Sequence, residues 1–263
     1  MLRKSSQFIN ACKNNNLEKI KKIVNDMNDI NKLTCKDNVT GLMIAYSWGD
    51  SDICKYLLEN NANVNAVDNK GNNCLFYTCE HSLKIIKDLI KYGINLNHQN
   101  NEGQTCLHYL FIDHSIAPTD FGYNDTKEDI LQIGTNVNII DNYGNTCFYY
   151  ACKYGYLKFL KLNKNAIQNI NHINDNGETY LHAVNTSNVD IIIFLVENKI
   201  NINKKDNNGK TYLRKACGVG NTDLVRYLLN HGAKPDESCI EIAKRSRYIT
   251  IEHLLHNSIV ISD

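Results

Sequence analysis

Apolar residues recur along the chain in pairs of short stretches with helical spacing, and polar turns separate the pairs. In one unit, residues 74–79 open a first stretch and residues 83–90 form a second. In a later unit, residues 212–217 precede residues 222–229, whose leucines and valine fall on one helix face. Each unit therefore predicts a turn, a short helix, a second short helix and another turn. Because one such unit cannot bury its apolar face alone, we expect the units to stack.

Two polar motifs repeat in step with this pattern. The first is a glycine in each polar turn, found at Gly71, Gly103, Gly144, Gly177 and Gly209. The second is an asparagine at one phase of the repeat, found at Asn31, Asn65, Asn97, Asn138, Asn171 and Asn203. Both motifs recur about every 33 residues and share one longer gap near 41. Two independent motifs with the same spacing indicate one continuous repeat array.

The residues beside these turns resemble those of ankyrin repeats. The chain reads T-C-L-H at 105–108, T-Y-L-H at 179–182 and L-L-N-H-G-A at 228–233, close to the family patterns T-P-L-H and G-A-D-V-N. The resemblance covers nearly the entire chain. It implies an all-α ankyrin-repeat solenoid of seven to eight helix-turn-helix units with short hairpin fingers. Residues 1–263 are expected to form a single array, with units at about 6–36, 37–67, 68–98, 99–140, 141–173, 174–205, 206–236 and 237–263, the outermost acting as caps.

The chain departs from the family pattern at two helix positions. The proline at the first helical position is absent, and the preceding threonines are left to cap the helices. Those threonines are Thr40, Thr105, Thr146, Thr179 and Thr211. The family histidine remains only at His108 and His182, so we expect its hydrogen-bond network to be incomplete and the array to be marginally stable. Asn38 stands where the second unit lacks its glycine, which a residue that tolerates the left-handed conformation permits.

Composition narrows the class of partner. Asparagine makes up roughly 15% of the residues, and its turn-forming side chain gives most of these asparagines a structural role. A formal net charge of +1, with scattered basic residues, offers no footprint for nucleic acid or a membrane surface. The longest apolar run, residues 191–196, is too short to cross a bilayer. We expect a soluble monomer in the cytoplasm, or in the nucleus, that binds proteins.

Chemistry-bearing patterns are weak. None of the ten cysteines sits in a C-x-x-C pair, and they recur at equivalent repeat positions that suit buried free thiols. Gly218-Val219-Gly220 falls in a predicted turn between two helices, with no preceding strand, so it is not a nucleotide-binding motif. No catalytic motif occurs, and we expect no enzyme activity, no cofactor and no metal.

The fourth unit is longer than the others. About eight extra residues fall within 114–125, between its two helical patterns. Two interpretations stay open: a tolerated insertion, or a contact loop that presents Phe121 and Tyr123.

The resemblance implies that partners bind the fingers and the ends of the first helices, where residues vary between units. The finger candidates are Asn69, Lys70, Asn72, Glu102, Gln104, Tyr143, Asn145, Asp175, Glu178, Asn208 and Lys210. The candidates just past a first helix are Trp48, Glu80, His81, Lys153, Tyr154 and Val219. Trp48 and Tyr154 are the expected anchors, since aromatic side chains dominate interface energies. The alternative for Trp48 is packing between units.

Two other functions remain open. The array could recruit substrates to a ubiquitin ligase, although residues 239–263 resemble a short helix pair and not an F-box-like segment; its predicted apolar face is Ala243, Ile249, Ile251, Leu254 and Leu255. Resemblance also implies that finger asparagines such as Asn65, Asn97 or Asn138 could be substrates of an iron- and 2-oxoglutarate-dependent asparaginyl hydroxylase.

The high usage of asparagine, isoleucine and lysine is similar to that of ankyrin-repeat proteins of giant DNA viruses of amoebae. A/T-rich protist genomes are the alternative source. The viral resemblance implies action in the cytoplasm of an infected host cell, on a host or viral protein.

Overall fold

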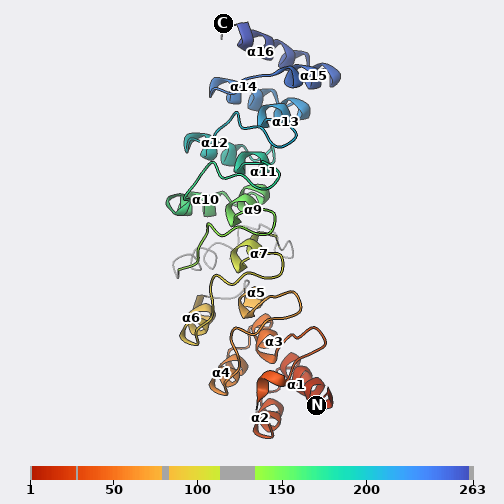
Figure 1. Ribbon diagram of the computed structural model, residues 1–263, viewed down its shortest axis with the longest axis vertical. Coiled ribbons are helices and arrows are strands. Elements are labelled where there is room, and N and C mark those ends of the chain that lie inside the picture. Colours follow the sequence, from red (N-terminus) through yellow and green to blue (C-terminus); the bar gives the residue numbers. More distant parts are fainter. Residues whose placement is uncertain (1, 28, 79–82, 113–133, 261–263) are drawn as a thin grey trace. The chain divides into compact units, whose positions relative to one another are not determined.

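The computed structural model describes residues 2–27, 29–78, 83–112 and 134–260. They fall into two compact units, an N-terminal half (residues 1–142) and a C-terminal half (residues 143–263). Within the described residues there is no β-strand, only an isolated bridge between Thr34 and Thr40. The all-α prediction is therefore confirmed (Figure 1). Residues 114–125 of the predicted insertion lie outside the described residues.

The N-terminal half consists of helix pairs. Its elements are α1 (Leu2–Lys13), α2 (Leu17–Asn25), the 3-10 turn η1 (Ile30–Lys32), α3 (Gly41–Ser47), α4 (Ser51–Glu59), α5 (Cys74–Thr78), α6 (Leu83–Lys91) and α7 (Cys106–Ile112). Asn16, Thr40 and Asp50 cap α2, α3 and α4 by accepting a backbone N–H in the first turn. Helix α3 packs against its partner α4 and also against α1 and α5 (Figure 1). Successive first helices therefore form one layer of the stack.

The C-terminal half repeats the same plan. Its elements are α9 (Cys147–Tyr154), α10 (Leu157–Asn163), the 3-10 turn η2 (Lys164–Ala166), α11 (Tyr180–Ala183), α12 (Val189–Glu197), α13 (Tyr212–Val219), α14 (Thr222–Asn230), α15 (Glu237–Arg245) and α16 (Ile249–Val260). Gly155 and Gly220 end α9 and α13 in the left-handed conformation. Gly218 and Val219 belong to the last turn of α13, so the predicted turn at 218–220 begins only at Gly220.

The core lies between stacked helices and holds most of the cysteines. Cys74, Cys106 and Cys147 are buried at the starts of their helices, as their equivalent repeat positions predicted, and Cys12, Cys152 and Cys217 are also buried. Burial raises the pKa of the Cys12, Cys74 and Cys106 thiols to about 12. These side chains are therefore neutral, unreactive thiols at physiological pH.

The C-terminal segment forms a helix pair, α15 and α16, as the sequence predicted. Ala243, Ile251 and Leu255 are buried in it, and Leu254 is half-buried. Ile249 is 67% exposed, so its predicted place on the buried apolar face was wrong. It is the first residue of α16 and lies outside the face that Ile251 and Leu255 bury. No helix in the described part of the chain is both long enough and apolar enough to span a membrane.

Candidate protein-binding surface

Each polar turn between repeats, here called a finger, is closed by its first residue. In the finger at residues 68–72, Asp68 Oδ1 accepts the N–H groups of Lys70 and Asn72, both at 2.8 Å. Asn100, Asn174 and Asp206 bind the equivalent two N–H groups of their own fingers. The carboxylate or amide oxygen thereby satisfies two backbone donors that the tight turn leaves without a backbone partner.

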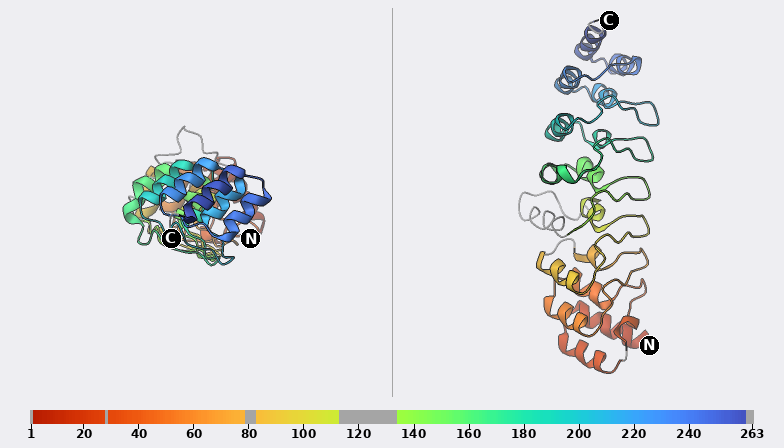
Figure 2. Two further views of the ribbon diagram at one scale, coloured as in Figure 1. Left: turned by 90° about the horizontal axis from the view of Figure 1, so that it is seen from above. Right: turned by 60° about the vertical axis from the view of Figure 1, so that its left-hand side comes forward.

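Neighbouring fingers are joined by a repeated pair of bonds. The Asn101 N–H donates to Lys70 O at 2.9 Å, and Asn101 Nδ2 donates to Asn69 O at 3.0 Å. Asn142 and Asn207 make the same two contacts to the finger before them. This finger ladder runs within each half of the chain, and Figure 2 shows that in each half the fingers project as loops from one side of that half's helices.

The repeated glycine makes the ladder possible. Gly71 has a φ of +77°, and a Cβ added there would lie 2.5 Å from Asn101 Oδ1. Glycine at this position therefore adopts the left-handed conformation without strain and leaves room for the close approach of the next finger. Asn38 occupies the equivalent position with a φ of 58°, which confirms the predicted substitution.

The second asparagine motif forms a separate ladder in the loops that follow the second helices. Asn65 Nδ2 donates to Gly93 O, and Asn65 Oδ1 accepts the Asn95 N–H, both at 2.8 Å. Asn203 makes the equivalent contacts to Gly232 O and the Lys234 N–H. Asn31, Asn97 and Asn171 likewise bind the following loop. The structural role predicted for the asparagines is confirmed by these bonds.

Three finger candidates are not available to a partner. Asn72, Gln104 and Asn145 are buried, which contradicts their prediction as contact residues. The reason is that the last finger position faces the neighbouring finger: Asn72 Oδ1 accepts Asn100 Nδ2 at 3.0 Å, and Asn145 Oδ1 accepts Asn174 Nδ2 at 2.9 Å. Glu178, at the same position, is half-buried and accepts the Tyr149 hydroxyl at 2.6 Å.

At the family histidine position, side chains of two different types form the hydrogen bonds that lead to the next finger. His182 Nδ1 accepts the Thr179 N–H at 3.1 Å, and its Nε2 lies 3.2 Å from Lys210 O in the next finger. Nε2 therefore carries the proton. Tyr149 stands at this position in another repeat, and its hydroxyl reaches the next finger through Glu178. The predicted gap in the network is thus closed at Tyr149 by a different donor.

The remaining candidates lie at the surface. Trp48 ends α3 and is 69% exposed, which excludes packing between repeats. Tyr143 is 59% exposed and Val219 is 58% exposed. Tyr154 is half-buried at the end of α9, and Lys153 Nζ lies 5.3 Å from the centroid of its ring. The polar candidates Asn69, Lys70, Glu102, Asp175, Asn208 and Lys210 are also exposed, whereas Glu80 and His81 lie outside the described residues.

Comparison with known families identifies this repeat. A family model described as ankyrin repeats (3 copies) matches residues 8–100 and 157–239, more than half of the chain. The chain belongs to the ankyrin-repeat family. A comparison with curated protein sequences finds no significant match. Ankyrin repeats generally mediate protein–protein interactions, and the family is typically a non-enzymatic interaction module.

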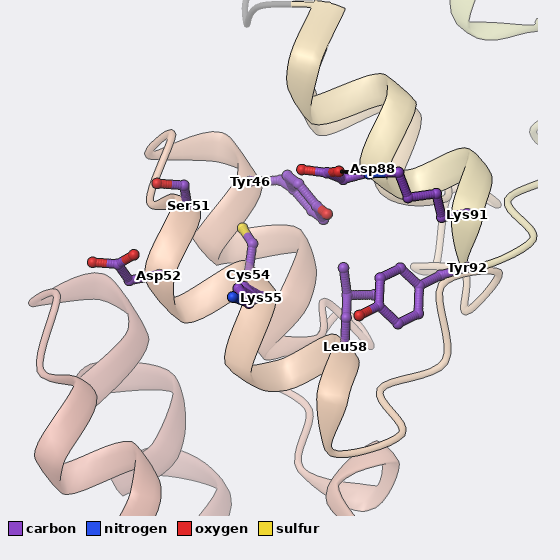
Figure 3. Close-up of a pocket in the computed structure, with 9 residues that line it drawn as sticks. All are labelled: Tyr46, Ser51, Asp52, Cys54, Lys55, Leu58, Asp88, Lys91 and Tyr92. Atoms are coloured by element: carbon purple, nitrogen blue, oxygen red, sulfur yellow. Dashed lines mark hydrogen bonds and ion pairs between the residues drawn. The ribbon is translucent and has the colours of Figure 1, made fainter.

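The ankyrin array also has a cleft that the sequence did not reveal. In the N-terminal half, a cleft of about 420 Å³ opens between α4 and α6, with Tyr46 of α3 at its base (Figure 3). Lys91 Nζ lies 2.8 Å from Asp88 Oδ1 beside it. Burial raises the pKa of Cys54, so its thiol is a poor nucleophile. The lining residues come from three helices that belong to two repeats. In the sequence, the pattern of each helix is that of an ordinary helix surface, so no single helix indicates the cleft.

In the described part of the ankyrin array, no group of three or more His, Cys, Asp or Glu side chains is arranged to hold a metal ion. The exposed fingertips and first-helix ends offer contact area and hydrogen-bonding groups to a partner.

Proposed function

We propose that this ankyrin array is a protein-binding scaffold whose contacts are made by the exposed ends of the first helices and the fingertips. The observation that carries the proposal is Trp48, an indole 69% exposed at the end of α3. Large aromatic side chains left in water are the residues that contribute most when they become buried in an interface. A host protein, or a viral one, is the partner that the compositional resemblance favours.

The C-terminal half offers a second set of anchors. Tyr143 and Val219 are more than half exposed, and the ammonium of Lys153 lies over the ring of Tyr154. The cation–π contact holds the Lys153 ammonium and the Tyr154 ring in place before a partner arrives. Less side-chain entropy is therefore lost on binding. The adjoining fingertips present Asp175 and Asn208, which supply hydrogen-bonding groups for specificity.

The test uses the full chain and matched alanine variants. Partners retained by the immobilised wild-type chain are identified by mass spectrometry, and their affinities are measured for Trp48→Ala and Tyr154→Ala. Loss of an anchor is expected to weaken binding by about 30-fold or more, the effect of a hot-spot truncation near 2 kcal/mol. Leu162→Ala is the control, since Leu162 is 55% exposed at the end of a second helix, α10.

Trp48 also provides a direct readout, because it is the only tryptophan in the chain. Burial of its indole by a bound partner is expected to shift its fluorescence emission to shorter wavelength. If both Trp48→Ala and Tyr154→Ala bound the partner with unchanged affinity and had circular dichroism spectra like that of the wild type, this surface would not be the binding surface.

A further inference from the structure

The finger at residues 206–210, here called the terminal finger, is the last in the chain. Its inner side is joined to the previous finger, where the Asn207 N–H donates to Asn176 O at 2.9 Å and Asn207 Nδ2 donates to Asp175 O at 2.8 Å. After α14, residues 233–236 lead directly into α15, whose N-cap is Asp236. This connection makes no finger, as Figure 2 shows above the terminal finger.

The outer side of the terminal finger therefore carries unused acceptors. Within the described residues, no N–H donates to Asn207 O or Asn208 O, the atoms that correspond to Asn69 O and Lys70 O in the earlier finger. Asn207 and Asn208 are both exposed. A Cβ added to Gly209, whose φ is +74°, would meet no heavy atom of the described chain within 4 Å. At Gly144 the same added atom would lie 2.6 Å from Asp175 Oδ1 of the next finger.

We propose that the terminal finger binds an asparagine-containing turn of a partner protein, which extends the finger ladder by one step. The backbone N–H of the partner's asparagine donates to Asn208 O, and its side-chain amide donates to Asn207 O. The asparagine side chain lies over Gly209, where the missing Cβ leaves space. Asparagine is preferred to aspartate because a carboxylate has no N–H to donate.

The physical basis is that of an unpaired sheet edge. A row of backbone acceptors that lacks its neighbour is a template for a segment of another chain, with the backbone giving affinity and one side chain giving specificity. The chain itself defines the fitting geometry, because Asn101, Asn142 and Asn207 all make this pair of contacts.

A second copy of the array does not fit this position. Helices α15 and α16 pack on α13 and α14 and occupy the level beside which the added finger would lie. A finger of another copy is followed at once by its own first helix, as Thr40 is followed by α3, so its helices would meet α15. A loop or peptide without attached repeats has no such obstacle. The occupant is therefore a turn on a protein of a different fold.

The probe is a head-to-tail cyclised peptide with the chain's own finger sequence, residues 205–211 (Lys-Asp-Asn-Asn-Gly-Lys-Thr). It is titrated into the ¹⁵N-labelled full chain up to about 5 mM, the range in which two or three hydrogen bonds are measurable. Amide shift changes are expected at residues 207–210 and not elsewhere. Replacing the peptide's ladder residue, the asparagine that corresponds to Asn207, by alanine is expected to weaken binding about 5-fold, the loss of one hydrogen bond near 1 kcal/mol.

A matched pair of variants tests the site on the chain. Gly209→Asn introduces a side chain at the site, with a residue type that tolerates a left-handed φ. Gly232→Asn is its control, because Gly232 has a φ of +88° and an added Cβ there also meets no heavy atom within 4 Å. At Asn38 such a side chain binds Asn69 Oδ1 of the next finger. Gly209→Asn is therefore expected to change the affinity of the asparagine peptide by adding a contact to its side-chain oxygen, whereas Gly232→Asn is expected to leave that affinity unchanged.

Three results would overturn the proposal: no shifts with either peptide, equal binding of both peptides to the wild-type chain, or shifts that centre on other residues. The proposal extends the proposed binding function to a separate contact. Failure of this proposal is distinguishable from failure of the proposed binding function. The peptide titration tests only residues 206–210, and Trp48→Ala and Tyr154→Ala leave those residues unchanged.

Discussion

In the fingers at residues 68–72 and 141–145, the last position, here called the inner edge, is buried and the tip is exposed, although the two lie two residues apart. Lys70 is exposed and Asn72 is buried, and in the C-terminal half Tyr143 is exposed and Asn145 is buried. Both edges are rich in polar residues, so polarity does not separate them. The difference lies in the bonds: the inner position binds the neighbouring finger, whereas the tip uses only its backbone for the ladder. A tip side chain can therefore change without loss of a scaffold contact.

The glycine that faces the next finger gives the largest expected effect. Gly144→Ala places a Cβ 2.6 Å from Asp175 Oδ1 and 3.0 Å from Asp175 N, whereas Gly209→Ala meets open space. Both carry left-handed strain of about 1–2 kcal/mol, and the clash should add about 1–3 kcal/mol at Gly144. The free energy of unfolding, from urea denaturation, measures both. Equal losses would mean that the finger contact contributes nothing beyond backbone strain.

An asparagine in the loop ladder should matter more than one at a fingertip. Asn203→Ala removes two bonds, to Gly232 O and the Lys234 N–H, and is expected to lower the free energy of unfolding by about 1–2 kcal/mol. Asn208→Ala, at an exposed tip, is expected to change it by less than about 0.5 kcal/mol. The same denaturation experiment compares them, and a larger effect at Asn208 would contradict the division between ladder asparagines and fingertip residues.

The smallest expected effect is a pH dependence of folding stability at His182, in α11. Burial lowers the pKa of His182 in the folded chain, although Lys210 O, Asp206 and Glu178 oppose the shift. The unfolded chain therefore binds the proton more readily, and stability is lost as the pH falls below the ordinary histidine value of about 6.5. Protonation of Nδ1 removes the acceptor of the Thr179 N–H.

Denaturation midpoints at pH 7.5 and pH 5.5 test this effect in the wild-type chain and in His182→Gln. The drop on acidification is expected to be smaller in the variant, by up to about 1 kcal/mol in unfolding free energy. His231, which is exposed, provides the control through His231→Gln. An identical drop in His182→Gln would place the pH dependence in other groups.

The repeat could be predicted from the sequence because its periodic glycines and asparagines reflect bonds that every repeat must make. The helices, the buried cysteines and the left-handed Asn38 all followed from that period. The buried inner-edge residues could not be distinguished from the exposed finger residues by sequence. Asn72 and Asn69 are the same residue type, and they differ only in the side chains that they contact in the neighbouring fingers. The exposure of Trp48 could not be predicted either, because it depends on where α3 ends against its neighbours.

The cleft and the Tyr149–Glu178 contact had no signal in the sequence for a related reason. Each joins side chains from different repeats, and the pattern of one repeat does not specify the side chain across from it. Periodicity predicts which positions meet, whereas the identity of the pair decides what the contact does.

The finger ladder also accepts unequal spacing along the chain. Asn101 reaches back 32 residues to Asn69, whereas Asn142 reaches back 41 residues to Asn101, with the same amide-to-carbonyl contact at 3.0 Å. The backbone rung recurs from finger to finger, so a duplicated repeat would find its backbone partners already in place on both sides. Such a chain can grow or lose length by copying whole units, and the number of residues between two rungs can differ without breaking the ladder.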